Sequence, residues 1–120
     1  WATYLTNLGD GKYQVGRLGW NADYPTMDNF LYPNFYSTAD NNYAKYVNAD
    51  VDAAIDAARQ VTDVEERKAA YRKINQTIAE SVPVIPLMFY ALDHVGSDRV
   101  ARMYLSPQNT ADLASAALNA

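Results

Sequence analysis

The sequence predicts a mixed α/β fold in which three main helices pack against a few strands, and two observations support this prediction. Apolar residues recur at helical spacing through 51–58 and 70–82, so that each run forms one face of a helix. Runs rich in β-favouring residues, at 13–20, 82–92 and 99–105, are bounded by glycine, proline and other turn formers. A chain of 120 residues is long enough to bury a modest core.

The amino-terminal segment predicts a short helix followed by a strand. Four residues at i, i+3, i+4 and i+7 would form one helical face: Trp1, Tyr4, Leu5 and Leu8. We expect the helix to stop at Gly9 or Gly11. The run 13–20 then predicts a strand, in which Gly19 lets another backbone approach closely. Pro25 ends this regular structure because it lacks a backbone donor.

Two helices are expected in the middle of the chain. The first begins near Asp28, with Asp28 or Thr26 as its cap. Its inward residues would be Phe30, Leu31 and Phe35. A polar connection then leads to a helix that Asp50 would cap. Its apolar face would comprise Val51, Ala54, Ile55 and Ala58. Asp52 and Asp56 would lie on its outer side, where acids near the amino end favour the helix dipole.

The next helix has the clearest start, because Asp63 and Glu66 stand at the cap and N3 positions of a capping box. Its buried stripe would be Ala70, Tyr71, Ile74, Ile78 and Val82. Its solvated face would be Arg67, Lys68, Arg72 and Lys73. We expect the stripe to face a strand around Ile85 and Leu87.

The carboxy-terminal part predicts extended structure. In the run 82–92, Pro83 and Pro86 prevent a continuing helix, and the apolar composition suits a buried strand. The run 99–105 would be the final strand, while 109–120 has weak helical character.

Charge and composition exclude several kinds of chemistry. With 14 acidic and 10 basic residues the chain is net negative, which argues against a nucleic-acid partner. The absence of cysteine removes thiolate metal sites, and the single histidine, His94, has no second histidine to share a transition metal. No Gly-x-Ser-x-Gly motif accompanies His94, so no catalytic triad is expected. We therefore expect a protein that is not an enzyme and needs no metal or cofactor.

The stretch GWNADYPTMDNF, residues 19–30, concentrates aromatic and polar side chains. Trp20 would offer a flat apolar wall, and Asp23 a negative charge that can accept a charge-assisted hydrogen bond from an ammonium group. An extended peptide with a free amino terminus fits these features. The alternative is that Trp20 belongs to the core and that Asp23 caps a turn at Tyr24.

This stretch also resembles a known family. GWNADYPTMDNFL is similar to the Gly-Trp-x-Ala-Asp-Tyr-x-x-Pro-x-x-Phe-Leu pattern of the extracytoplasmic solute-binding proteins that serve peptide and nickel ABC importers. Similar runs follow in the family's order, at 41–63, 65–89 and 94–103, so that the resemblance covers roughly residues 1–106. The family often has Asp-Pro after Tyr-Pro, where this chain has Thr26 and Met27.

The resemblance implies a carboxy-terminal portion of a two-lobed fold of the type II periplasmic-binding-protein kind. Residues 1–18 would end the distal lobe and form the crossover strand, and residues 19–120 would belong to the proximal lobe. It further implies a monomeric binder of a peptide for an ABC importer, with the permease subunits as partners and no cofactor. The location would be extracytoplasmic, in the periplasm or at the outer face of the membrane as a lipoprotein.

In peptide-binding members of this family the corresponding Asp holds the α-ammonium of the peptide, and the segment around the Trp pairs with its backbone. By resemblance these ligand-binding roles fall on Asp23, on Trp20, and on the backbone of Asn21 and Ala22. Two alternatives remain: another solute, such as a nickel chelate or a sugar, or a sensor or enzyme domain built on the same fold.

Overall fold

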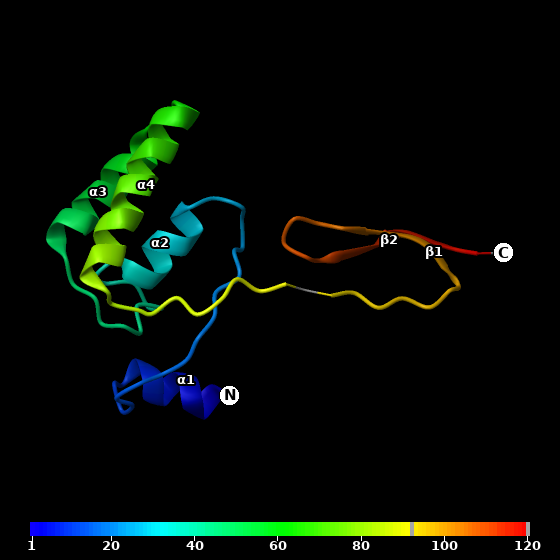
Figure 1. Ribbon diagram of the computed structural model, residues 1–120, viewed down its shortest axis with the longest axis horizontal. Helices are drawn as coiled ribbons and strands as arrows, with labels where there is room; N and C mark the ends of the chain where they lie inside the picture. Colours follow the sequence, from blue (N-terminus) through cyan, green and yellow to red (C-terminus); the bar gives the residue numbers. More distant parts are fainter. Residues whose placement is uncertain (92, 120) are drawn as a thin grey trace.

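The computed structural model describes residues 1–91 and 93–119, and three helices form its packed part (Figure 1). The helices in chain order are α1 (Ala2–Gly9), α2 (Asp28–Phe35), α3 (Ala49–Gln60) and α4 (Val64–Ser81). Two strands follow, β1 (Val100–Leu105) and β2 (Ala111–Leu118). The expected mixture of helices and strands is confirmed. Helices α2, α3 and α4 pack together, whereas α1 and the β-hairpin lie away from them (Figure 1).

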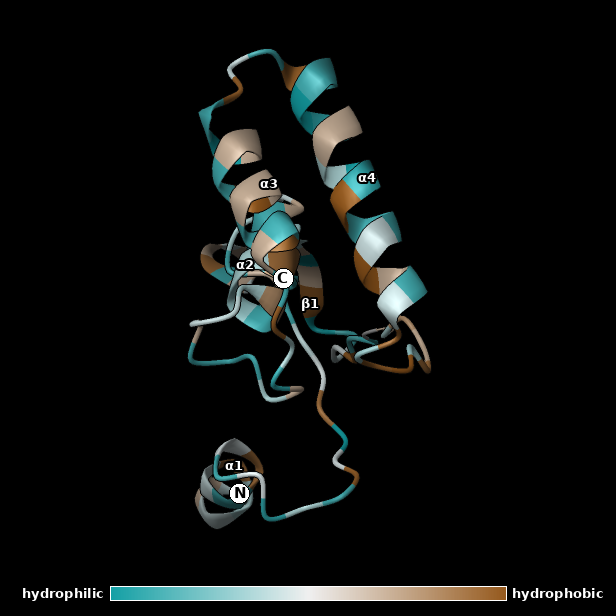
Figure 2. Cartoon of the chain, turned by 90° about the vertical axis from the view of Figure 1, so that its left-hand side faces the viewer, coloured by the Kyte–Doolittle hydropathy of each residue, from teal (hydrophilic) through white to brown (hydrophobic). Residues whose placement is uncertain are grey.

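The shape of the molecule is extended. Its radius of gyration is 18.4 Å, against about 14 Å for a compact chain of this length. Figure 2 shows α3 and α4 side by side, with α1 set apart below them. Many large apolar side chains are therefore exposed, among them most of those in the segment 84–89.

The core lies between α2, α3 and α4. Its buried residues are Leu31, Val51, Ile55, Ala58, Tyr71, Ile74 and Ile78. The apolar faces expected for α3 and α4 are thus confirmed at their centres. The expectation that α4 faces a strand around Ile85 and Leu87 is wrong, because α4 packs on α3 and α2 while both residues are exposed, Ile85 by 77%. Val82 is exposed as well, because it leaves the helix in the left-handed conformation.

The segment after α4 is extended, as expected, but it is not a buried strand. Residues 82–91 have no strand partner among the described residues, and Leu92 lies outside them. A strand needs a neighbour to satisfy its backbone groups, so an apolar run without one remains an exposed extended segment.

The expectation of a strand at 13–20 is also wrong: this run pairs with no strand among the described residues, and a side chain of α1 occupies part of its backbone. The Tyr4 hydroxyl on α1 donates to the carbonyl oxygen of Arg17 at 2.9 Å and accepts from the Arg17 amide at 2.8 Å. Both backbone groups that Arg17 would offer to a ladder are therefore used. The helix α1 itself is confirmed, and Gly11 beyond its end has a φ of +68°, which glycine adopts without strain.

The start of α2 differs from expectation. Neither Asp28 nor Thr26 caps it through a side chain, and the Thr26 carbonyl oxygen instead accepts from the Asn29 amide at 3.2 Å. Leu31 and Phe35 turn inward as expected because they are four residues apart and share one face. Phe30, on a different face, is exposed, contrary to expectation.

The expected cap of α3 is wrong, and the expected cap of α4 is confirmed. Asn48, not Asp50, caps α3: its side chain accepts from the amides of Asp50 and Val51 at 3.1 and 3.2 Å. Asp50 already lies inside the helix. Asp63 caps α4 as expected, accepting from the Glu66 amide at 2.9 Å.

The two acids on the outer side of α3 bind the preceding loop. Asp52 Oδ1 accepts from the Ser37 amide at 2.9 Å, and Asp56 Oδ2 accepts from the Tyr36 hydroxyl at 3.0 Å. They therefore do more than support the helix dipole.

In the carboxy-terminal hairpin, one expected strand is confirmed, and a segment expected to be helical is a strand instead. The strand expected at 99–105 is β1, but the segment expected to be weakly helical forms β2, antiparallel to it, with Ala120 outside the described residues. Val100 pairs with Leu118 and Leu105 with Ala111. Cross-strand pairing here overrides the helix preference of alanine, which is a weak local effect.

Within the described residues, no helix combines the length and the apolar composition needed to cross a membrane.

Candidate functional site

The candidate ligand-binding residues lie in the loop that leads into α2, and the first turn of α2 holds this loop. Asn29 Oδ1 accepts from the Asp23 amide at 2.8 Å and from Trp20 Nε1 at 3.3 Å. Trp20 is partly buried, Asn21 and Asp23 are exposed, and Ala22 is partly buried. The structure thus brings Trp20 and Asp23 together around one amide oxygen.

The Asp23 carboxylate faces solvent. Among the described residues it accepts no hydrogen bond and forms no ion pair, so it does not cap the turn at Tyr24. This turn is closed instead by the Thr26 amide, which donates to the Tyr24 carbonyl oxygen at 2.8 Å. The carboxylate retains its full capacity to accept hydrogen bonds from a cationic group.

The backbone of the loop also has unused groups. Within the part of the chain that the structure describes, the amides and carbonyls of Asn21 and Ala22 make no backbone hydrogen bonds. An extended ligand could pair with them as a neighbouring strand would.

A second carboxylate, that of Asp28, connects the loop to the helices. Its Oδ2 accepts from the Tyr24 hydroxyl at 3.0 Å, and its Oδ1 accepts from the Tyr71 hydroxyl at 2.9 Å. Arg59 Nε on α3 lies 3.3 Å from the same Oδ1, and the Asp28 side chain is only 15% exposed. Burial, and next the hydrogen bond to Asp28, raise the pKa of Tyr71 well above its usual value. Tyr71 therefore remains a neutral donor at physiological pH.

A pocket of about 200 Å³ lies beside this network. Its lining residues are Tyr24, Thr26, Asp28, Arg59, Arg67 and Tyr71. Its two arginines already have contacts: the Arg59 guanidinium lies 4.3 Å from the centre of the Tyr32 ring, and Arg67 Nη1 donates to the Val61 carbonyl oxygen at 3.2 Å. The pocket is therefore part of the polar network that connects the loop to α3 and α4.

Gly19, directly before Trp20, is approached by a side chain. A Cβ atom at this position would overlap the ring of Tyr90, whose Cε2 and Cζ would lie at 2.7 and 2.8 Å. The sequence predicted a close approach here, but by a backbone. Tyr90 was missed, since nothing in the sequence relates two positions so far apart.

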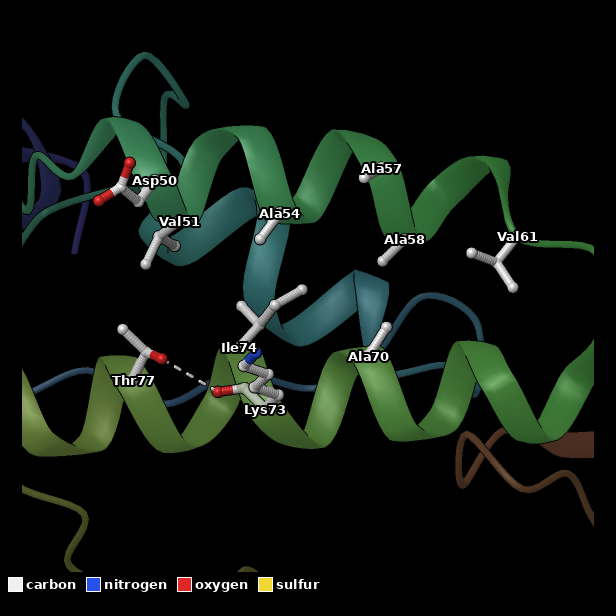
Figure 3. Close-up of a pocket in the computed structure, with 10 residues that line it drawn as sticks. All are labelled: Asp50, Val51, Ala54, Ala57, Ala58, Val61, Ala70, Lys73, Ile74 and Thr77. Carbon is white, nitrogen blue, oxygen red and sulfur yellow. Dashed lines mark hydrogen bonds between the residues drawn. The ribbon is translucent and has the colours of Figure 1, made fainter.

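A larger groove of about 430 Å³ lies between α3 and α4 (Figure 3). Small apolar side chains from both helices point towards one another across it, including Ala54, Ala58 and Ala70. Apart from Asp50, Lys73 and Thr77 its lining is apolar, so it offers few polar groups to orient a peptide, and we do not select it as the ligand site. No cluster of His, Cys, Asp or Glu among the described residues is able to hold a metal ion.

The chain is similar in sequence to several known binding proteins. The chain is 37% identical over 93 residues to the periplasmic oligopeptide-binding protein OppA of Haemophilus influenzae, covering 75% of the chain and 16% of that protein. It is 30% identical over 118 residues to di/tripeptide-binding protein 4 of Pseudomonas aeruginosa, covering 96% of the chain and 22% of that protein. The chain belongs to the family of periplasmic oligopeptide- and dipeptide-binding proteins. The resemblance expected from the sequence is confirmed.

A third relative is named for a different ligand. The chain is 32% identical over 92 residues to the probable deoxycholate-binding periplasmic protein YgiS of Escherichia coli, covering 77% of the chain and 17% of that protein. The chain thus spans 16–22% of the length of these three relatives. No protein-family model matches the chain.

Proposed function

We propose that this chain contributes part of the ligand cleft of an extracytoplasmic peptide-binding protein that serves an ABC-type importer. The observation that carries the proposal is the exposed Asp23 carboxylate, which has no partner among the described residues while Asn29 holds its backbone. The names of two relatives, an oligopeptide-binding and a di/tripeptide-binding protein, support a peptide as the solute.

Each residue of the loop has a distinct role in this proposal. The Asp23 carboxylate accepts hydrogen bonds from the α-ammonium group of the peptide, a charge-assisted contact that is stronger than a neutral one. The backbone groups of Asn21 and Ala22 pair with the extended peptide backbone. Trp20 forms the apolar wall beside the first peptide residue.

The proposed architecture is the carboxy-terminal portion of a two-lobed fold that closes around its ligand. Residues 1–18 complete the distal lobe and its crossover, and residues 19–120 belong to the proximal lobe. Two observations support this arrangement: the small share of the relatives' length that the chain spans, and the exposed apolar segment 84–89. Residues in such a segment are normally covered in a folded protein.

We further propose that the whole protein is a monomer, is not an enzyme and needs no cofactor. Its partners would be the permease subunits of the importer. Its location is the periplasm, or the outer face of the membrane as a lipoprotein. Two of the three relatives are named as periplasmic proteins, which supports the location, and all three are named as binding proteins, which supports the absence of catalysis.

A second candidate function is the binding of a non-peptide solute. The relative named for deoxycholate favours it, since deoxycholate is an amphipathic anion and not a peptide. Trp20 suits an apolar ligand, whereas an exposed carboxylate at Asp23 repels an anionic one.

Titration calorimetry on the full-length protein that contains these residues tests the two candidates. The ligands are a set of tripeptides, the same peptides with an acetylated amino terminus, and deoxycholate. We expect the free peptides to bind at least about tenfold more tightly than the acetylated ones, because acetylation removes a hydrogen bond to a charged group. Equal affinity for both forms would refute the role of Asp23, and binding of deoxycholate alone would support the second candidate.

A further inference from the structure

We infer that Asn29 is a positioning residue for the ligand site, and that its side-chain oxygen holds Trp20 and Asp23 in the arrangement that receives the peptide terminus. This inference rests on the proposed function. It adds a residue that contacts no ligand and acts through the two that do.

The geometry at Asn29 is well defined. The residue is only 5% exposed, and its Oδ1 receives two N–H groups, the Asp23 amide at 2.8 Å and Trp20 Nε1 at 3.3 Å. Both partners are donors, so only the oxygen of the side-chain amide satisfies them. The orientation of the Asn29 amide is thereby determined by its neighbours.

The two hydrogen bonds control different parts of the site. The bond to the Asp23 amide fixes the peptide plane before Asp23, and with it the direction in which the carboxylate leaves the backbone. The bond to Trp20 Nε1 fixes the rotation of the indole ring, and hence the position of the apolar wall. Asn29 lies in the first turn of α2, and its neighbour Asp28 ties that turn to Tyr71 on α4, so the packed helices support the loop.

The chain offers a matched control in Asn42. Asn42 is also 5% exposed, and it holds the loop before α3 with three hydrogen bonds, two of them to Tyr46. It makes no hydrogen bond to Trp20 or Asp23. The Asn42→Leu variant therefore shows how the loss of a buried asparagine affects the fold when Trp20 and Asp23 keep their hydrogen bonds.

Three variants separate positioning from stability. Asn29→Leu keeps the size of the side chain but removes the acceptor, and Asn29→Asp keeps an oxygen that accepts from both N–H groups. Asn42→Leu is the control. Should Asn29→Leu fail to fold, Asn29→Ala takes its place, because it removes the same acceptor without adding branched bulk.

The first measurement is the ratio of dissociation constants for N-acetylated and free tripeptide in the full-length protein. The second is the NMR signal of the Trp20 indole N–H in the 120-residue chain. We expect Asn29→Leu to lower the ratio about tenfold, as the loss of buried hydrogen bonds does, and to shift the indole signal towards its solvent-exposed position. Asn29→Asp and Asn42→Leu should preserve both the ratio and the signal.

The outcomes distinguish the inference from the proposed function. An unchanged ratio in Asn29→Leu, or an equal loss in Asn42→Leu or Asn29→Asp, overturns the positioning role and leaves the proposed function intact. A ratio of one in the wild-type protein overturns the proposed role of Asp23, and the positioning role of Asn29 with it.

Discussion

The Tyr71 hydroxyl, in the middle of α4, donates a 2.9 Å hydrogen bond to Oδ1 of Asp28, the first residue of α2 and 43 positions earlier in the chain. The other oxygen of the same carboxylate accepts from Tyr24, in the loop that carries the candidate ligand site. One carboxylate thus joins the longest helix to this loop. The stability of the helical core and the shape of the loop are coupled through it.

We predict that Tyr71→Phe lowers the free energy of unfolding at pH 7 by about 1.5–3 kcal/mol, because it removes a hydrogen bond to a charged group. The pKa of Tyr71 is raised in the folded state, by burial first and then by Asp28. Its stabilising contribution is therefore complete below the unfolded pKa of about 10 and decreases as the pH rises above that value. The gap between wild type and Tyr71→Phe should narrow above pH 10.

Urea unfolding followed by circular dichroism between pH 7 and pH 10.8 measures this gap. Tyr104→Phe, at an exposed position of β1, is the control and should leave the stability unchanged at every pH. A gap of constant size across the range would contradict the raised pKa.

We predict that Asp23→Asn weakens binding of free peptides by the full-length protein by about 1.5–3 kcal/mol and leaves the affinity for N-acetylated peptides unchanged. The substitution keeps the shape of the side chain and removes its charge. Asp23 is exposed and has no partner among the described residues, so the melting temperature should not change. Titration calorimetry gives the two affinities, with the exposed Asp40→Asn as the control. Equal weakening for both peptide forms would argue for a general structural effect.

We predict that Ile74→Ala destabilises the chain by about 2–5 kcal/mol, since Ile74 is 4% exposed and belongs to the core between α2, α3 and α4. Ile85→Ala is the matched control. Its side chain is 77% exposed, so the same truncation should change the stability by less than about 0.5 kcal/mol. Chemical unfolding compares the two variants. A larger loss for Ile85→Ala would mean that the segment 84–91 packs on the helices.

We predict that the 120-residue chain alone does not bind peptide detectably. The Asp23 carboxylate faces water, where an ion pair contributes only about 0–1 kcal/mol. Association costs at least about 4 kcal/mol of translational and rotational freedom, which one exposed contact does not offset. NMR titration of the Trp20 signals with a peptide pool measures the binding, and the full-length protein is the positive control. Saturable binding at micromolar peptide would show that these residues form a complete site.

Features of the helices that depend only on nearby residues were predictable from the sequence. The Asp63 cap lies three residues from the amide that it binds, and the buried stripe of α4 repeats over a single helix. Both features depend on neighbours within one or two turns, so they were predictable. The cap of α3 was assigned to Asp50 instead of Asn48, because both residue types cap helices and only the backbone conformation distinguishes them.

The candidate site was partly predictable. Trp20 and Asp23 stood out by residue type and spacing, and their ligand role remains a prediction. Asn29 lies in the same stretch and was not selected, because asparagine is common in turns and its buried oxygen is visible only in the structure. The contact of Tyr90 with Gly19 was not predictable from the sequence, because the ring lies against Gly19 only after the chain has folded.

The residue pattern alone was sufficient to locate the helical segments α3 and α4, to place their apolar faces, and to indicate membership of the peptide-binding family. Which extended segments became strands depended on tertiary contacts: 100–105 paired with 111–118, while 13–20 and 82–91 did not pair among the described residues. The difference lies in the range of the hydrogen bonds. A helix satisfies its backbone within four residues, whereas a strand or a buried polar side chain requires a partner that sequence spacing does not specify.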